Sequence, residues 1–227
     1  MATITPFERP GIRGFLHRPA SGANGGGLVL THGAGGNAAS PLLAAAADAF
    51  TAAGFTVLRC DLPFRQQRPR GPPSPAAAAA DRAGLGGAVN AMRELVPGSI
   101  VLGGISYGGR QATILAGDEP RIAAALVLFS YPLHPPGRPE RWRTEHFPRV
   151  RLPALFVQGT RDPFGSPEAL REAVAAIPAP TRIVAIAGAG HELKRGGFDL
   201  PAVVAALRDL ADPPIRPTGP LSSEKVT

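Results

Sequence analysis

The sequence contains one cysteine, Cys60, so no disulfide can form within the chain and no cysteine pair is available for a structural zinc site. The histidines lack the spacing of metal ligands, and no glycine-rich segment continues into the lysine and hydroxyl residue of a P-loop. We therefore expect no metal and no other cofactor. The cysteine content also favours a cytoplasmic protein, with Cys60 as a small buried hydrophobic residue.

Long hydrophobic runs are absent as well. The longest, such as residues 123–129, fall far short of the roughly 20 residues of a membrane-spanning helix. The first residues, MATITPFERPG, have no apolar core of the kind found in secretory signal peptides. Both absences argue against a membrane partner and again favour a cytoplasmic location.

Acidic residues are comparatively few. There are 17 Asp and Glu against 24 Lys and Arg, nearly all of them arginine, which gives a formal charge of +7. Such an excess can attract nucleic acids or other anions. No helix and no mixed aromatic and basic stretch carries a nucleic-acid-binding motif, however. We interpret the charge as a solvated basic surface and do not expect a nucleic-acid partner, while the oligomeric state stays open.

Short apolar segments alternate with helical segments along most of the chain. After one or two edge strands within residues 4–18, buried strands are expected at residues 28–31, 55–59, 99–105, 123–129, 154–158 and 181–186. Helices are expected at residues 41–53, 76–95, 107–116, from 167 onward, and 199–211. The alternation predicts an α/β fold with a mostly parallel central sheet and helices on both faces.

One domain accounts for this pattern, because 227 residues is a common length for a single α/β domain. We place it at residues 1–212. Residues 61–75 and 130–152 are rich in proline, show no regular pattern and are expected to be loops, the second of which shapes the pocket. Residues 213–227 are polar and rich in proline and are expected to form a disordered tail.

The clearest chemical motif is Gly104-Ile105-Ser106-Tyr107-Gly108, at the junction of an apolar strand and a helix. A sharp turn there holds the serine in a strained conformation and needs small residues two positions before and after it. The hydroxyl then projects at the sheet edge, beside the N-terminal N–H groups of the following helix. The motif predicts Ser106 as a nucleophile.

A serine hydroxyl is a weak nucleophile until a base accepts its proton. His191, directly after the last expected strand, fits the base, and Asp162, directly after the preceding strand, fits the carboxylate that orients it. The chain order of serine, acid and histidine is the one expected for this architecture. The structural alternatives are a turn serine, a turn-initiating aspartate before Pro163, and a loop histidine. The occurrence of all three residues together favours a catalytic triad.

A glycine-rich segment, THGAGG at residues 31–36, follows the strand at residues 28–31. Acyl transfer places negative charge on a carbonyl oxygen, and each backbone N–H directed at it can contribute roughly 3 kcal/mol. We predict the N–H groups of Tyr107 and Ala34 as the two donors of an oxyanion hole, with Gly35 as the alternative for the second. His32 begins this loop and is either structural or in contact with the substrate.

Further substrate contacts are expected on the loops that follow the parallel strands. The candidates are His32, Gly35, Arg65, Tyr131 and His134. The arginines of two such loops predict a small-molecule acyl substrate that carries negative charge, and these are Arg65, Arg68, Arg70, Arg138, Arg141 and Arg143. The alternative is that these side chains extend into solvent.

Together these elements, over residues 28–210, resemble the α/β-hydrolase superfamily. The narrower resemblance is to small members with a minimal lid, related to dienelactone hydrolase and to the hydrolase-like domain of testis-expressed protein thirty and NSL complex regulatory subunit three. It is carried by LTHGAGG at residues 30–36, SYPLHPP at 130–136, RTEHFPRV at 143–150, FVQGTRDPFG at 156–165 and GAGHELK at 188–194.

The resemblance implies an α/β-hydrolase fold and hydrolysis without a cofactor, but it does not fix the substrate, because one fold hosts many reactions. Dienelactone hydrolase has a cysteine nucleophile where this chain has Ser106, so its substrate is not carried over. We predict a carboxylesterase- or thioesterase-like serine hydrolase that cleaves an ester, thioester or related acyl bond through an acyl-enzyme. Some animal members of the narrower group are regulatory or scaffold parts, so the alternative is a catalytically silent interaction or scaffold protein.

Overall fold

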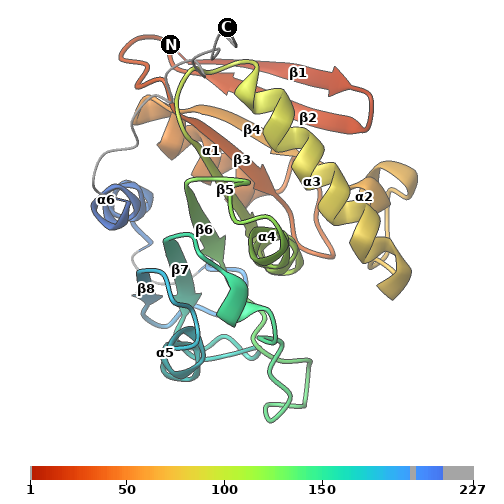
Figure 1. The fold of residues 1–227 in the computed structure, drawn as a ribbon, viewed down its shortest axis with the longest axis vertical. Helices are drawn as coiled ribbons and strands as arrows, with labels where there is room; N and C mark the ends of the chain where they lie inside the picture. Colours follow the sequence, from red (N-terminus) through yellow and green to blue (C-terminus); the bar gives the residue numbers. More distant parts are fainter. Residues whose placement is uncertain (1, 195–197, 212–227) are drawn as a thin grey trace, which may run out of the picture.

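The computed structural model describes residues 2–194 and 198–211, which form one eight-stranded sheet with helices on both faces (Figure 1). The strand order is β1-β2-β4-β3-β5-β6-β7-β8. The predicted α/β class is confirmed. The tail expected at residues 213–227 lies outside the described residues. Of the helices within those residues, none combines the length and apolar character needed to span a bilayer.

Six parallel strands form most of the sheet. They are β3 (Gly27–Thr31), β4 (Thr56–Cys60), β5 (Ile100–Ile105), β6 (Ala125–Phe129), β7 (Ala154–Gly159) and β8 (Thr181–Ile186). The strands β3, β6 and β7 are buried along their whole length. Helices cover both of their faces, which is why their sequences are continuous apolar runs rather than alternating ones. The edge strand β8 is only partly buried.

An antiparallel hairpin closes the other edge of the sheet. It consists of β1 (Thr3–Arg9) and β2 (Ile12–Arg18), and β2 pairs antiparallel with β4. Gly11 lies in the turn between them with φ +75°, a conformation that glycine adopts without a steric penalty. Both strands expected within residues 4–18 are therefore present, although only β1 lies at the edge.

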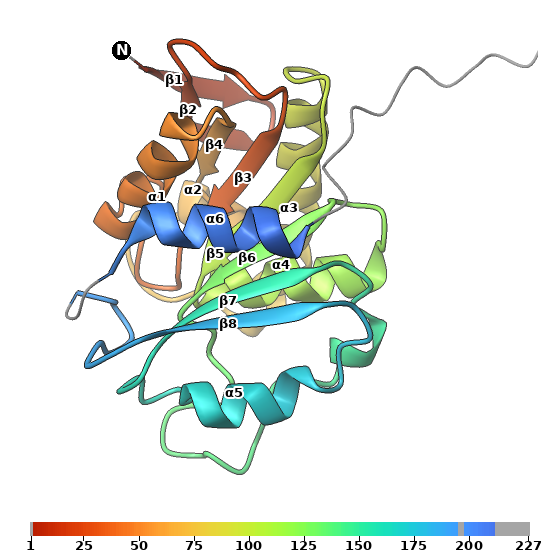
Figure 2. The same cartoon turned by 90° about the vertical axis from the view of Figure 1, so that its left-hand side faces the viewer.

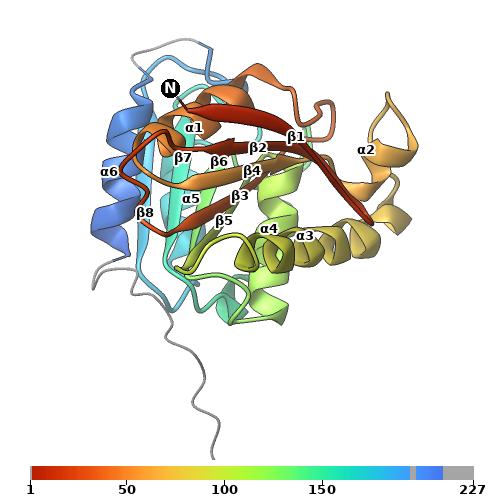
Figure 3. The same ribbon diagram turned by 90° about the horizontal axis from the view of Figure 1, so that it is seen from above.

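Helices pack on the two faces of the sheet as separate layers (Figures 2 and 3). One face is covered by α1 (Pro41–Ala52) and α6 (Leu200–Leu210). The other is covered by α3 (Ala78–Arg93), α4 (Tyr107–Asp118) and α5 (Pro167–Val174). Ser166 caps α5 by accepting a hydrogen bond from Ala169 N at 3.2 Å. Ser40 precedes α1 without capping it, because its hydroxyl accepts from Asn37 N instead.

The segment expected to be a loop at residues 61–75 is partly helical. It contains α2 (Pro63–Gln67), and a 3₁₀ turn at Pro75–Ala77 leads into α3. Each of these short helices begins with proline, whose fixed φ suits the first helical position. Five residues are too few to show a helical repeat, so the sequence pattern missed α2. Residues 130–152 are irregular as expected, apart from a 3₁₀ turn at Phe147–Arg149.

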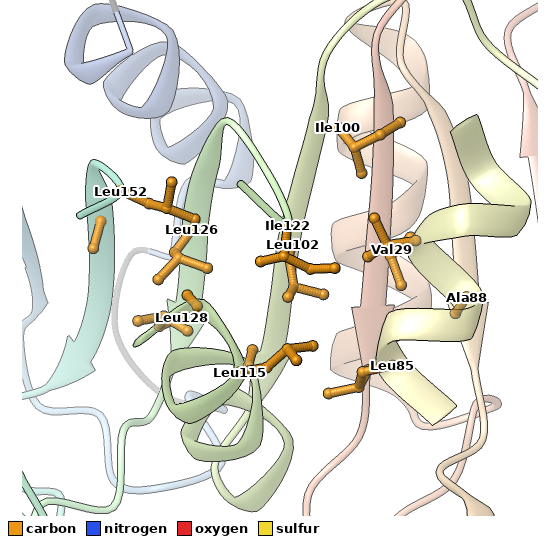
Figure 4. Packing of buried hydrophobic residues seen from close by; sticks show 14 of the residues in the cluster. Val29, Leu85, Ala88, Ile100, Leu102, Leu115, Ile122, Leu126, Leu128 and Leu152 are labelled. Atoms are coloured by element: carbon orange, nitrogen blue, oxygen red, sulfur yellow. The ribbon is translucent and has the colours of Figure 1, made fainter. Parts of the chain in front are cut away.

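The core between the sheet and the layer of α3 and α4 is made of aliphatic side chains (Figure 4). The cluster includes Val29 from β3, Leu102 from β5 and Leu85 from α3, and it extends to Leu126 and Leu128 on β6 (Figure 4). All of these side chains are fully buried. Burying one of the leucines contributes about 2 kcal/mol to folding. The packed layer therefore holds the strands in position, and with them the loops that follow their carboxyl ends.

A buried polar cluster anchors residues 130–152 to α4. His146 Nε2 lies 2.8 Å from Thr113 Oγ1, and the Tyr131 hydroxyl lies 3.3 Å from the same imidazole nitrogen. The Tyr131 ring packs against Phe147 and Phe156. Burial of His146, aided by the charge of Arg110, lowers the pKa of its imidazole to about 4. The irregular segment is thus tied to the helix by a neutral histidine.

Acidification is expected to weaken the fold through His146. Unfolded histidine titrates near 6.5 and this buried one near 4, so the unfolded state binds the proton first. The contribution of His146 to stability is therefore fully present above about pH 6.5, and about 3 kcal/mol is lost as the pH falls from 6.5 to 4. Urea unfolding of the wild type and His146→Gln between pH 4 and 7 measures this. The wild type should lose more stability than the variant, with His134→Gln as control, and parallel curves for all three proteins would contradict the assignment.

Candidate active site

The site lies where four loops meet at one edge of the sheet. Parallel strands present their carboxyl ends at the same edge, so the residues that follow β3, β5, β7 and β8 converge there. Those loops carry His32 to Gly36, Ser106, Asp162 and His191 respectively. The expected site residues, distant in sequence, are therefore placed together by the register of the sheet.

Ser106 occupies a strained turn between β5 and α4. Its φ is 51° and its ψ is −115°, and a positive φ in a residue with a side chain costs on the order of 1–3 kcal/mol. The turn is possible because the residues two positions before and after the serine lack side chains. A Cβ on Gly108 would lie 2.5 Å from the His32 carbonyl oxygen, and one on Gly104 would lie 2.8 Å from the Gly108 carbonyl carbon. The turn thus requires glycine at both positions.

A chain of two hydrogen bonds connects the three predicted triad residues. His191 Nε2 lies 2.9 Å from Ser106 Oγ, and His191 Nδ1 lies 2.8 Å from Asp162 Oδ2. A carboxylate only accepts, so Nδ1 carries the proton and Nε2 is left free to accept one from the serine hydroxyl. The Asp162 side chain is fully buried, whereas that of His191 is 23% exposed. The arrangement therefore leaves His191 partly accessible and desolvates its carboxylate partner.

Gln158 holds the carboxylate in place, a role that the sequence analysis did not predict. Its Nε2 donates to Asp162 Oδ2 at 3.0 Å and to the Gly165 carbonyl at 2.8 Å, while its Oε1 accepts from Tyr131 N at 2.8 Å. Phe164 N donates to the other carboxylate oxygen at 2.9 Å. The available signal was a lone amide within the apolar strand β7, because a buried amide needs hydrogen-bond partners.

The glycine-rich loop after β3 lies close to the serine. A Cβ on Gly33 would lie 3.4 Å from Ser106 Cβ. The Gly33 carbonyl accepts from His32 Nδ1 at 2.8 Å and from Gly36 N at 3.0 Å. Because a trans peptide is planar, fixing this carbonyl directs the Ala34 N–H the opposite way. That geometry is compatible with Ala34 as an oxyanion donor, and the assignment stays a prediction.

Tyr107 is fixed through its side chain, so its backbone N–H is held as well. The hydroxyl donates to Asp81 Oδ2 at 2.7 Å, and the other oxygen of that fully buried carboxylate accepts from Phe64 N at 3.0 Å. Burial, followed by the hydrogen bond to Asp81, raises the pKa of the Tyr107 phenol well above its usual range. As the first residue of α4, Tyr107 has an N–H without a partner inside the helix.

Three of the predicted substrate contacts are corrected by the structure. His32 is fully buried, donates from Nδ1 to the Gly33 carbonyl and accepts at Nε2 from Leu62 N at 3.1 Å. Burial lowers the pKa of this imidazole, so it is neutral and structural. Tyr131 is also fully buried, in the core beneath α4. Arg65 is 3% exposed, and its guanidinium donates to backbone carbonyls instead of facing the pocket.

The remaining two contacts stay predictions. His134 is 9% exposed, and its backbone N donates to the Phe164 carbonyl at 3.2 Å, which places it beside the loop that carries Asp162. The Phe164 ring in turn lies 4.5 Å from the His191 ring, edge to face. Gly35 faces open space, since a Cβ there would contact nothing within 4 Å.

Comparisons with known proteins identify the family and the fold of the chain. The family described as alpha/beta hydrolase domain matches residues 25–199. Among solved structures, dienelactone hydrolase from Anabaena variabilis superposes with a TM-score of 0.69 at 21% identity, covering 95% of this chain and 99% of that one. TT1662 from Thermus thermophilus gives 0.72 at 18%, covering 93% and 99%. At these identities the likeness shows the fold.

Two further similarities are more limited. XC6422 from Xanthomonas campestris, described as an a/b serine hydrolase without lid, has a TM-score of 0.65 at 19% identity and covers 92% of each chain. The polyketide synthase ThaQ of Burkholderia thailandensis is 44% identical over 66 residues, which is 28% of this chain and 3% of that protein. The chain thus spans only a small part of that relative.

Replacing Gln158 should lower the activity of the site without unfolding the protein. Gln158→Met keeps the side-chain length but removes the donor to Asp162, so the carboxylate and His191 lose their alignment. We expect kcat to fall by up to roughly a hundredfold, as misplacement of about 1 Å can cause. Ester turnover well below the unfolding temperature checks this. Gln66→Met, which removes hydrogen bonds to Gly11 and Asp61 carbonyls, is the control. An unchanged kcat in folded Gln158→Met would contradict the assignment.

Proposed function

The chain belongs to the alpha/beta hydrolase domain family, and we propose that within it this protein is a serine hydrolase of acyl compounds, with Ser106 as nucleophile. Membership of that family supports a hydrolase function in general. The finer proposal is that the substrate is an ester, thioester or related acyl derivative and that the reaction passes through an acyl-enzyme. The narrower kinship with testis-expressed protein thirty and NSL complex regulatory subunit three stays a prediction.

One observation carries the proposal: the continuous hydrogen-bonded chain from Asp162 through His191 to Ser106 Oγ. Strain at a serine would not suffice by itself. Ser130, at the end of the neighbouring strand β6, also has φ 51° and is fully buried, yet its hydroxyl has no hydrogen-bond partner among the described residues. Ser106 differs because a base accepts its proton, which is the condition for a nucleophilic hydroxyl.

The proposed reaction has two stages. Ser106 Oγ attacks the acyl carbonyl carbon while His191 Nε2 takes the hydroxyl proton, and the new imidazolium is stabilised by Asp162. The tetrahedral intermediate collapses, and His191 gives that proton to the departing alkoxide or thiolate. A water molecule then attacks the acyl-enzyme with His191 again as base, which releases the carboxylic acid and restores the serine.

Negative charge on the carbonyl oxygen is stabilised by backbone donors on either side of Ser106. The proposal assigns this role to Tyr107 N–H at the start of α4 and to Ala34 N–H in the glycine-rich loop. Both peptides are fixed before substrate arrives, the first through Asp81 and the second through the anchored Gly33 carbonyl. Donors that need no reorganisation are the most effective form of such stabilisation.

The rival function is a catalytically silent interaction protein on the same fold. Its surface is basic, with a formal charge of +7 for the chain, and charge of this kind can recruit acidic partners. The two functions differ in what they demand of Ser106, because only the hydrolase requires its hydroxyl to react. Covalent chemistry at that atom therefore separates them.

A fluorophosphonate probe should label the wild type at Ser106, and p-nitrophenyl acetate and butyrate should be hydrolysed. Both reactions should disappear in Ser106→Ala, since the variant lacks the attacking oxygen. His191→Gln should lose at least a thousandfold in kcat, because within residues 2–194 and 198–211 only His191 is hydrogen-bonded to the Ser106 hydroxyl. Peptide mapping of the adduct and steady-state kinetics provide the measurements.

Ser130→Ala is the matched control for this experiment, because it removes another serine of positive φ from the same edge of the sheet. Labelling and turnover should survive that change. A folded wild type that neither labels nor turns over ester would refute the hydrolase proposal and favour the silent interaction protein.

The charge of the substrate is the second part of the proposal, and the structure changes which arginines support it. Arg65 is turned inward, while Arg68, Arg70, Arg138 and Arg141 are exposed. Arg110 lies one helical turn beyond Ser106, and its Nε is buried without a hydrogen-bond partner among the described residues. Burial and the charge of Arg110 together lower the pKa of Arg143. Arg110 thus follows the nucleophile by one helical turn, and Arg143 lies close enough to Arg110 for their charges to interact. Two such partly desolvated cations favour an anionic acyl group.

Esters that bear a distal carboxylate should therefore be turned over with a higher kcat/KM than neutral esters of equal length. Arg110→Met should reduce this preference by roughly tenfold, and added salt should weaken it. Arg138→Met, at an exposed position of the segment 130–152, is the control. Equal kcat/KM for both esters at low and high salt would contradict an anionic preference.

A further inference from the structure

We propose that Arg65 is a positioning residue that holds the glycine-rich loop of residues 33–36 in the shape needed to bind an oxyanion. The inference rests on the proposed hydrolase function and assigns to Arg65 a role in the same site, although the side chain does not reach the substrate. It begins from an unusual placement, since this arginine is 3% exposed and forms no salt bridge within the described part of the chain.

The guanidinium of Arg65 connects two segments of backbone. On the loop side, Nε donates to the Gly36 carbonyl and Nη2 to the Ala34 carbonyl, each at 2.8 Å. On the opposite side, Nη2 donates to the Gly71 carbonyl at 3.0 Å and Nη1 to the Arg68 carbonyl at 3.1 Å. The planar fork of an arginine can serve several such acceptors at once, which the single ammonium of a lysine cannot do in the same geometry.

The loop of residues 33–36 needs hydrogen bonds from side chains to hold one conformation. Three of its four residues, Gly33, Gly35 and Gly36, are glycines, and glycine has the greatest backbone freedom to lose on ordering. A loop that moved would direct its N–H groups at the oxyanion only part of the time. Stabilisation of the oxyanion depends on donors fixed beforehand, so any anchor of this loop acts on the transition state.

Arg65 and His32 fix successive peptides of the loop. His32 holds the Gly33 carbonyl, and this directs the Ala34 N–H. Arg65 holds the Ala34 carbonyl, and by the same planarity it directs the Gly35 N–H. The directions of both candidate N–H donors for the second position of the oxyanion hole are therefore fixed by the buried side chains of His32 and Arg65. The far end is fixed separately, because Ala38 N donates to Asp61 Oδ1 at 2.7 Å.

A hollow of about 390 Å³ lies beside Arg65, and it suggests a test by chemical rescue. It is lined in part by Arg13, Asn37, Asp61, Arg65 and Pro69. Truncation of the arginine to alanine would extend this hollow toward the loop carbonyls. A free guanidinium ion is small enough to enter such a space and carries the same donors, so it can replace the missing group.

The test compares Arg65→Ala and Arg65→Lys with the wild type, and Arg68→Ala is the matched control. Arg68 is exposed and its side chain donates to the Pro72 carbonyl. For p-nitrophenyl butyrate we expect kcat to fall roughly 10- to 100-fold in Arg65→Ala, with KM within about twofold. The affinity of a trifluoromethyl ketone, which forms a tetrahedral adduct, should fall by a similar factor.

Four further readouts distinguish positioning from a general loss of structure. Millimolar guanidinium should restore part of the kcat of Arg65→Ala but not alter Arg68→Ala, and Arg65→Lys should be only partly active. The pH dependence of kcat/KM should keep its shape, because the His191 and Asp162 contacts are untouched. Amide hydrogen exchange should become faster at residues 33–38 in Arg65→Ala, while the core strands keep their protection.

The outcomes are separable from those of the hydrolase proposal. If the wild type labels and turns over ester but Arg65→Ala keeps its kcat and its ketone affinity, the positioning role is overturned. If the fluorophosphonate probe does not label the wild type, the hydrolase proposal is refuted. Hydrogen exchange then still shows whether Arg65 orders the loop of residues 33–36. Unchanged exchange at residues 33–38 in Arg65→Ala overturns the inference whatever the activity.

Discussion

The close approach of three backbone segments around Ser106 is the constraint on which the site depends. The turn between β5 and α4 can adopt its positive φ only because Gly104 and Gly108 let the chain fold back on itself and against the His32 carbonyl. Gly33 then brings the loop after β3 to the serine. Each contact is an approach of backbone atoms that a larger residue would prevent, so the position of the nucleophile and that of the oxyanion loop are set by the same packing.

Buried polar side chains supply the rigidity that the loops cannot provide for themselves. The loops at the sheet edge lack the regular ladders of strands and helices, so their backbone groups need other partners. Gln158 holds Asp162, Asp81 holds Tyr107, and His32 and Arg65 hold the glycine-rich loop. All four of these side chains are less than 4% exposed. Buried side chains thus hold the loops of the site in place, while His191 remains partly exposed.

Much of the fold could be predicted because the signals were local. Continuous apolar runs identified the buried strands, and the order of serine, acid and histidine after successive strands identified the triad candidates. The short helix α2 was missed because five residues show no helical repeat. The errors at the site share a different cause: they concern side chains whose burial depends on distant parts of the chain. Tyr131 and Arg65 stood in loops and looked available to substrate, yet one fills the core beneath α4 and the other turns inward to carbonyl acceptors. Gln158 and Asp81 were missed for the same reason, since their partners lie elsewhere in the sequence.

The sequence by itself determined the α/β class, the family and the identity of the three residues proposed for catalysis, because apolar periodicity and glycine spacing are properties of contiguous segments. Only the tertiary structure decided which polar residues face the pocket and which hold it in shape. Burial and hydrogen-bond partnership arise from segments that meet in space, and the register of parallel strands sets those meetings. In this protein, Arg65 was expected to contact the substrate. The tertiary structure instead buries it against the carbonyls of the loop beside Ser106.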